Sequence, residues 1–164
     1  MKKKYYFLIS CILLILTSHC TGYKPIFSST DLKFKIEEHK IGGDKALSND
    51  LFTRLNRLSD KSNENIKSVY LDIFTAKDKA SAVRDLTGKT IEYKITLTIK
   101  FVMKDYLTED SMLNETFTSS LTYKIQDNYS ETVSLENSSY QSLLNKIYQE
   151  LLIKLSERII NEWF

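Results

Sequence analysis

The sequence predicts one α+β domain, a two-layer sandwich in which a mostly antiparallel sheet of about four strands packs on two amphipathic helices. Two observations support this fold class. Several segments alternate apolar and polar residues, as half-buried strands do, and two segments repeat apolar residues at spacings of three and four, as amphipathic helices do. The order along the chain is β-α-β-β-β-α.

The first strand and helix are expected between residues 32 and 58. Apolar and charged residues alternate from 32 to 37, which predicts a strand. Gly42-Gly43 then breaks the strand, and Asp44 is of a type that caps helices. Leucines on one helical face follow: Leu47, Leu51, Leu55 and Leu58. The polar run 59–65 is expected to end this helix.

Three further strands are expected. The second carries Val69, Leu71 and Ile73 on one face. The third has the cleanest alternation, with apolar residues at every second position: Ile91, Tyr93, Ile95, Leu97, Ile99, Phe101 and Met103. The fourth presents one face made of Phe117, Ser119, Leu121, Tyr123 and Ile125. A polar turn over 105–114 joins the third strand to the fourth, which predicts an antiparallel pair.

The segment 75–90, between the second and third strands, is polar and rich in charge, and we expect a charged loop there. Ala80 to Val83 in its middle can still pair as strand, and Gly88 marks a turn.

A long helix is expected at the end of the chain. Ser138-x-x-Gln141 reads as a capping box, and Ser134 is an alternative, earlier cap. The apolar stripe that follows holds Leu144, Ile147, Leu151, Leu155 and Ile159. About 26 residues would give a helix of roughly 39 Å, long enough to cross a whole sheet.

The first 19 residues have the pattern of an export signal. Three lysines precede a short apolar run over 5–16, and small polar residues follow it. The run is shorter than the roughly 20 apolar residues that span a membrane. We therefore predict a signal peptide at 1–19, a lipidated linker at 20–30 and a single domain at 31–164.

Cys20 lies directly after the apolar run, where bacterial lipoproteins carry their acylated cysteine. Cys11 matches the preceding residues of that pattern better, but cleavage there would leave an apolar core of only about four residues, against the expected 7–15. Two alternatives remain open: an ordinary signal peptide cut near Ser18 to Cys20, and an uncleaved anchor. No cofactor is expected beyond a covalent lipid on Cys20.

Composition excludes several classes of function. Removing the three signal lysines leaves 20 basic against 21 acidic side chains, so the processed chain gives no indication of nucleic-acid binding. No cysteine–histidine cluster is present to hold zinc or copper. His39 is the one histidine left after processing, and we expect it to be an ordinary surface residue on a strand edge rather than a catalytic base.

Two surface features are candidates for binding. The basic residues of the charged segment have the chemistry to meet lipid phosphates: Lys77, Lys79, Arg84 and Lys89. The alternative is a solvated loop neutralised by its own Asp78 and Asp85. Threonine-rich faces of the third and fourth strands form the second feature, because a hydrogen-bonding sheet face suits the polar lumen of a barrel. An ordinary exposed sheet face is the alternative.

Several motifs occur along the chain in a characteristic order: Cys20-Thr21-Gly22-Tyr23-Lys24-Pro25-Ile26-Phe27, Ala80-Ser81-Ala82-Val83-Arg84-Asp85-Leu86-Thr87-Gly88-Lys89, Tyr93-Lys94-Ile95-Thr96-Leu97-Thr98, Ser120-Leu121-Thr122-Tyr123 and the closing helix. Taken in this order, they resemble the family of lipopolysaccharide-assembly lipoproteins (LptE) in its alphaproteobacterial form. The chain differs from the family at His19, at Thr21 and in a closing helix poorer in alanine and arginine.

The resemblance implies a non-enzymatic lipoprotein at the periplasmic face of the outer membrane. Members of that family plug the LptD β-barrel, help it fold and take part in lipopolysaccharide insertion. The alternative is a stand-alone periplasmic lipoprotein that binds a small ligand or an envelope partner.

Overall fold

The computed structural model describes residues 34–59 and 66–163, with side chains through residue 158. The elements are β1 (Phe34–Gly43), α2 (Lys45–Leu58), β2 (Lys67–Arg84), β3 (Thr90–Asp105), β4 (Ser111–Lys124) and α3 (Tyr129–Trp163). The predicted α+β fold with the order β-α-β-β-β-α is confirmed. The predicted signal peptide and linker, with Cys11 and Cys20, lie outside the described residues.

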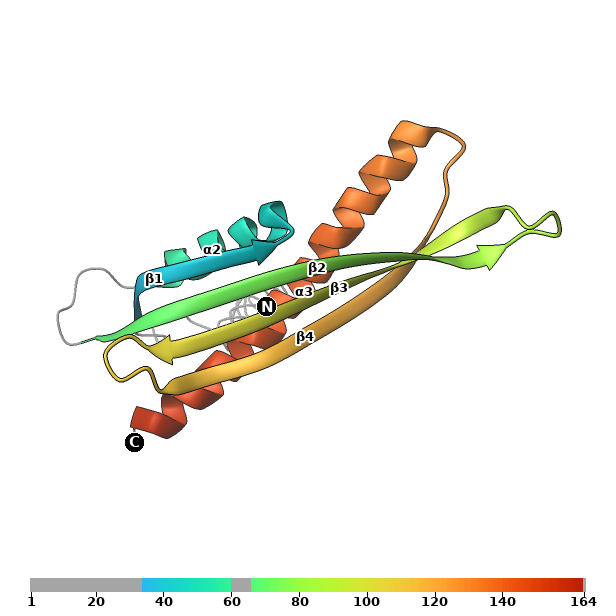
Figure 1. The fold of residues 1–164 in the computed structure, drawn as a ribbon. Coiled ribbons are helices and arrows are strands. Elements are labelled where there is room, and N and C mark those ends of the chain that lie inside the picture. The colour runs from blue at the N-terminus through green and yellow to red at the C-terminus, as the bar shows by residue number, and fades with distance from the viewer. Residues whose placement is uncertain (1–33, 60–65, 164) are drawn as a thin grey trace, which may run out of the picture. The chain divides into compact units, whose positions relative to one another are not determined.

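The four strands form one sheet in the order β1-β2-β3-β4. β1 and β2 are parallel, whereas β2–β3 and β3–β4 are antiparallel hairpins. Parallel strands need a crossover connection, usually a helix, and α2 supplies it. Figure 1 shows both helices on the same side of the sheet, with α3 crossing behind the strands.

The core lies between the sheet and this helical layer. Alternate residues of the three long strands face it and are almost completely buried, including Leu71, Ile73, Ile95, Leu97, Ile99 and Phe101. The predicted leucine face of α2 and the predicted stripe of α3 cover them, since Leu51, Leu55, Leu144, Ile147 and Leu151 are fully buried. The apolar faces that a period of two gives the strands and a period of about 3.6 gives the helices therefore pack together in one core. Neither of the described helices is both long and apolar enough to cross a membrane.

The start of α2 agrees with the sequence prediction. Asp44 is the N-cap, and its Oδ1 accepts a hydrogen bond of 3.0 Å from the backbone N–H of Leu47. Gly43 has φ of +72°, a left-handed conformation that glycine adopts without a Cβ clash. The backbone N–H of Asp44 then donates to the carbonyl oxygen of Thr75 at 2.9 Å, so β1 ends pinned to β2.

The predicted start of α3 is wrong. The helix begins at Tyr129 and runs for 35 residues, which is roughly 52 Å. Asn128 caps it, because Asn128 Oδ1 accepts from the N–H of Ser130 at 2.9 Å. Ser138, by contrast, lies inside the helix and donates to the carbonyl oxygen of Leu135. Ser134 is also inside the helix rather than at its cap.

Two predicted loops are also wrong in part. β4 begins at Ser111, so the last four residues of the predicted turn 105–114 are strand, and Met112 and Leu113 are buried. The predicted charged loop is strand as far as Arg84, because residues after Thr75 keep pairing with β3. β1 stops pairing at Thr75, so β2 is exposed from Ala76 to Arg84 and has β3, but no longer β1, beside it. β4 continues along the other side of β3 as far as Lys124, which pairs with Glu92.

Candidate interaction surface

The sheet face turned away from α2 and α3 is covered by none of the described elements, and it is largely polar. Alternate residues of β3 and β4 line it: Lys94, Thr96, Thr98, Lys100, Thr116, Thr118, Ser120 and Thr122. Thr98 and Thr118 are directly paired across the strands, with hydroxyl oxygens 3.4 Å apart. Phe74 of β2, 46% exposed, adds one apolar side chain. This face, hereafter the open face, presents hydroxyl and ammonium groups on a sheet held rigid by the core behind it.

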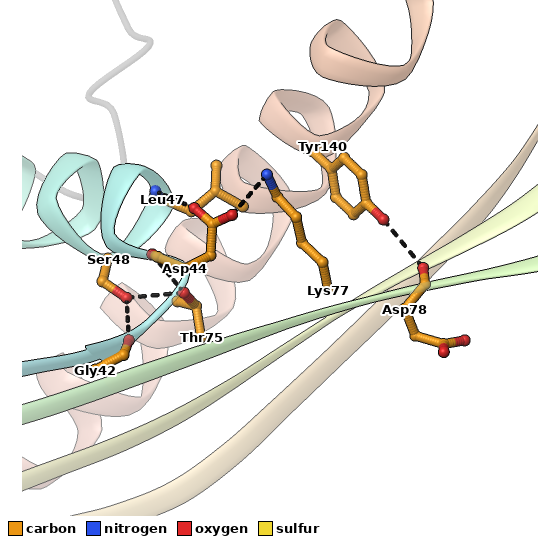
Figure 2. A network of polar contacts seen from close by, with 8 residues as sticks. All are labelled: Gly42, Asp44, Leu47, Ser48, Thr75, Lys77, Asp78 and Tyr140. Atoms are coloured by element: carbon orange, nitrogen blue, oxygen red, sulfur yellow. Dashed lines mark hydrogen bonds and ion pairs between the residues drawn. The ribbon is translucent and has the colours of Figure 1, made fainter. Parts of the chain in front are cut away.

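Lys77 points to the opposite, helical side and joins three elements (Figure 2). Its Nζ lies 2.8 Å from Asp44 Oδ2, so one carboxylate both caps α2 and pairs with β2. The hydrogen bond from Lys77 lowers the pKa of Asp44, and partial burial opposes the change only in part. The same ammonium lies 4.8 Å from the centre of the Tyr140 ring on α3.

Hydroxyl groups complete this junction (Figure 2). The buried Ser48 Oγ lies 2.8 Å from the carbonyl oxygen of Gly42 and 2.8 Å from Thr75 Oγ1. Thr75 Oγ1 donates to the carbonyl oxygen of Asp44 at 2.9 Å. Tyr140 reaches β2 by donating to the carbonyl oxygen of Asp78 at 3.0 Å, while the Asp78 side chain points away from it. The polar groups at this end of the helical layer are therefore used within the fold.

Lys79 lies in an aromatic and acidic cluster. Its ammonium forms an ion pair with Glu136 of α3 and lies 4.3 Å from the centre of the Tyr93 ring. Tyr123 donates to the same Glu136 oxygen at 2.6 Å. Burial raises the pKa of Glu136, but the hydrogen bonds from Lys79 and Tyr123 outweigh it, and the pKa is lowered overall. Burial likewise opposes the charge on Lys79, yet the hydrogen bond to Glu136 raises its pKa.

The end of the β2–β3 hairpin carries the remaining predicted basic residues. Asp85 organises the turn, since its Oδ1 accepts from the N–H of Thr87 at 2.9 Å and from the N–H of Lys89 at 3.0 Å. Leu86 at the tip is fully exposed. Arg84 and Lys89 flank this turn and are exposed. The hairpin end thus combines a bare apolar tip with two accessible cations.

A shallow hollow of about 360 Å³ lies between this hairpin and the start of α3. Its walls include Lys79, Lys89, Asp127, Tyr129 and Glu136. Both signs of charge line it, so electrostatics alone favour neither an anionic nor a cationic ligand.

The structure therefore divides the four predicted basic residues into two pairs. Lys77 and Lys79 face the helical layer and have carboxylate partners on other elements, Asp44 and Glu136, rather than the neighbouring Asp78 and Asp85. Arg84 and Lys89 remain at the exposed hairpin end.

The partners of Lys77 and Lys79 were not predictable from the sequence, because only the fold brings them together. Asp44 and Tyr140 lie at Lys77, and Glu136 and Tyr123 lie at Lys79.

His39 lies on the edge strand β1 as predicted, exposed and stacked on Phe52 with ring centroids 3.9 Å apart. Among the residues that the structure describes, no three His, Cys, Asp or Glu side chains come together as a metal site.

Comparison with known proteins identifies the fold. No protein-family model matches the chain, and a search of curated protein sequences finds no relative. A crystal structure of a minor lipoprotein from Acinetobacter baumannii matches with a TM-score of 0.54 at 13% identity, covering 77% of this chain and 92% of the other. A solution structure of lipoprotein B from Nitrosomonas europaea matches with a TM-score of 0.53 at 12% identity, covering 80% and 88%. The chain shares its fold with these bacterial lipoproteins.

Proposed function

We propose that this chain is a non-enzymatic, lipid-anchored lipoprotein of the cell envelope that lies at the periplasmic face of the outer membrane. There it seats in the LptD β-barrel, assists the assembly of that barrel and takes part in lipopolysaccharide insertion. Cys20 is the proposed site of the lipid. The observation that carries the proposal is the open face: a polar, hydroxyl-rich sheet surface on a rigid two-layer fold that known lipoproteins share.

Physical reasoning connects this surface to a barrel lumen. The interior of a large outer-membrane barrel is polar, so a plug must offer hydrogen bonds rather than an apolar patch. Threonine hydroxyls donate and accept, and lysines reach across to carboxylates or carbonyl groups. A lipid on Cys20 together with a barrel contact would hold the protein by two attachments, which makes membrane association stable.

The test is a pull-down of the tagged full-length chain from outer membranes in mild detergent, with mass spectrometry of its partners. We expect one large barrel in near-equal amount. Replacing Thr98 and Thr118 by glutamate places two charges at the centre of the open face and should reduce the recovered barrel at least several-fold. The matched control places glutamate at Gln141 and Gln149, which are exposed on α3. Recovery without any barrel, with Cys20 still lipidated, would favour a stand-alone periplasmic lipoprotein.

Lipopolysaccharide phosphates are the proposed ligands of the hairpin cations. Arg84 and Lys89 are the accessible members of the predicted set, because Lys77 and Lys79 already pair with carboxylates. Reversing Arg84 and Lys89 to glutamate should weaken lipopolysaccharide binding with little loss of stability. Reversing Lys77 and Lys79 should lower the stability of the fold as well. Unchanged binding after all four reversals would remove this part of the proposal.

A further inference from the structure

The two edges of the sheet are built differently. β1 carries charges along its length, at Lys35, Glu37, Glu38 and Lys40, and its pairing has a bulge between Ile36 and Glu38. Charges and bulges are the usual devices that keep an edge strand from pairing with another chain. β4 has neither device over its central part. From Thr116 to Tyr123 it has no charged residue, no proline and a regular pairing with β3.

The outer side of β4 therefore offers a row of backbone hydrogen-bonding groups. Within the described residues, the backbone of 116–123 forms hydrogen bonds only with β3. A side chain bonds the β4 backbone only after this run, where Gln126 Nε2 donates to the carbonyl oxygen of Lys124 at 3.0 Å. Every second N–H and C=O of an edge strand points away from its neighbour. Eight residues of unguarded edge are enough for a partner strand of ordinary length.

The charges on β4 lie at the two ends of this edge. Glu115 precedes the uncharged run and Lys124 ends it. Lys124 is 78% exposed, and its one ion pair among the described residues is a long one, 3.9 Å to Glu92. A strand that runs antiparallel to β4 would place its first residue opposite Lys124 and its last residue opposite Glu115.

We propose that β4 accepts an extended segment of a partner protein as a fifth, antiparallel strand. The fitting segment is uncharged and β-branched in its middle, acidic at its amino end and basic at its carboxyl end. Main-chain hydrogen bonds give such a strand its affinity, and the two end charges fix its direction and register.

A lone strand fits this edge better than a second copy of the chain does. α3 lies chiefly over β4, at the margin of the sheet. Pairing two β4 strands about a two-fold axis would set two α3 helices above strands only about 4.8 Å apart, whereas packed helices need 8–10 Å between axes. An added strand without its own helix meets no such obstacle.

The experiment uses the purified full-length chain in detergent and a fluorescent ten-residue peptide, measured by anisotropy. The peptide has eight alternating threonines and valines between an amino-terminal glutamate and a carboxyl-terminal lysine. A second peptide exchanges the two charged ends. We expect the first peptide to bind about fivefold more tightly, the size of effect that two exposed ion pairs give. The double variant Glu115→Lys with Lys124→Glu should reverse this preference.

Backbone pairing is tested with the first peptide methylated on alternate amide nitrogens, in each of the two possible alternations. One alternation should weaken binding more than tenfold, because those N–H groups face β4, and the other should bind nearly as before. The proposal would be overturned if neither of the two unmethylated peptides bound the chain. It would also be overturned if the two methylation patterns had the same effect on affinity. A stable dimer of the chain alone that Ser120→Lys disperses would overturn the choice of occupant.

This inference is independent of the proposed function, because no barrel takes part in the peptide experiment. Thr96→Lys separates the two surfaces, since Thr96 lies on the open face directly opposite Ser120 but one strand in from the edge. It should weaken recovery of the barrel and leave peptide binding within about twofold.

Discussion

Among the glycines that the structure describes, Gly43 is the one at which an added Cβ would clash most severely. Its φ is +72°, and a Cβ built there would lie 1.8 Å from the carbonyl oxygen of Thr75. Gly43→Ala must therefore move the backbone that holds β1 against β2, at an expected cost of about 2–4 kcal/mol in unfolding free energy. Urea unfolding followed by circular dichroism measures it. Gly88→Ala is the control, because φ is +85° but no atom lies within 4 Å, and about 1 kcal/mol is expected. Equal losses at the two glycines would contradict the clash.

Glu136 gives a prediction in the pH dependence of stability. Its pKa is lowered in the folded chain, so its stabilisation is present above the unfolded value near 4.5 and is lost as the pH falls through the folded value. Glu136→Gln should cost about 1 kcal/mol at pH 7, because it removes the charged partner of Lys79 and Tyr123. The difference from the wild type should shrink as the pH falls below 4.5 and should disappear once the folded-state carboxyl is protonated. Glu150→Gln, on the same helix, is the control, and a difference for Glu136→Gln that does not fall with pH down to acid unfolding would exclude the ion pair as its cause.

The beginning of α3 is decided by its cap. Asn128→Ala removes the acceptor for the Ser130 N–H and should cost about 1 kcal/mol. Ser138→Ala should change stability by less than about 0.5 kcal/mol, because that residue lies within the helix and alanine is a better helix former. Urea unfolding compares the two variants, with hydrogen exchange over 129–136 to locate the effect. A larger loss of unfolding free energy for Ser138→Ala than for Asn128→Ala would indicate that the helix begins at Ser138, as the sequence pattern predicts.

The same element shows where sequence patterns were sufficient and where they were not. Strands and helices whose apolar side faces the core were predicted, because burial imposes their period on the sequence. The first turns of α3 carry few apolar residues and bury Thr132 and Ser139 instead, so no period marked them. The sequence pattern predicts a loop in the outer part of β2 for a related reason. Its strand conformation depends on pairing with β3 rather than on burial, and polar residues satisfy pairing equally well.

The candidate surface was predictable only in its local part. The threonine-rich alternation of the third and fourth strands pointed to a polar sheet face, and the structure has one. The partners in the ion pairs were not predictable. Lys79 and Glu136 lie 57 residues apart in the sequence, and Lys77 pairs with Asp44, from which α2 separates it along the chain. Opposite charges occur throughout the chain, and only the fold selects among the possible pairs.

Across the whole molecule, stability should be unevenly distributed between the core and the hairpin end. Leu71, Ile73 and Ile99 are buried on a sheet covered by both helices. By contrast, β2 is exposed from Ala76 to Arg84, and β3 is the one described strand beside it there. Amides of the core strands should exchange only when the whole chain unfolds, and amides of 81–92 by a local opening of much lower free energy.

Native-state hydrogen exchange at low denaturant concentrations measures both classes of amide in one sample. The local opening should be nearly independent of denaturant, because little surface becomes exposed, whereas the core amides should follow the global slope. Equal free energies for the two groups would show that the hairpin end is held as firmly as the core. The expected difference places Arg84, Leu86 and Lys89 on the part of the sheet that opens most easily. That part can therefore adjust to an irregular lipid or protein surface, while the open face and the β4 edge keep a fixed geometry.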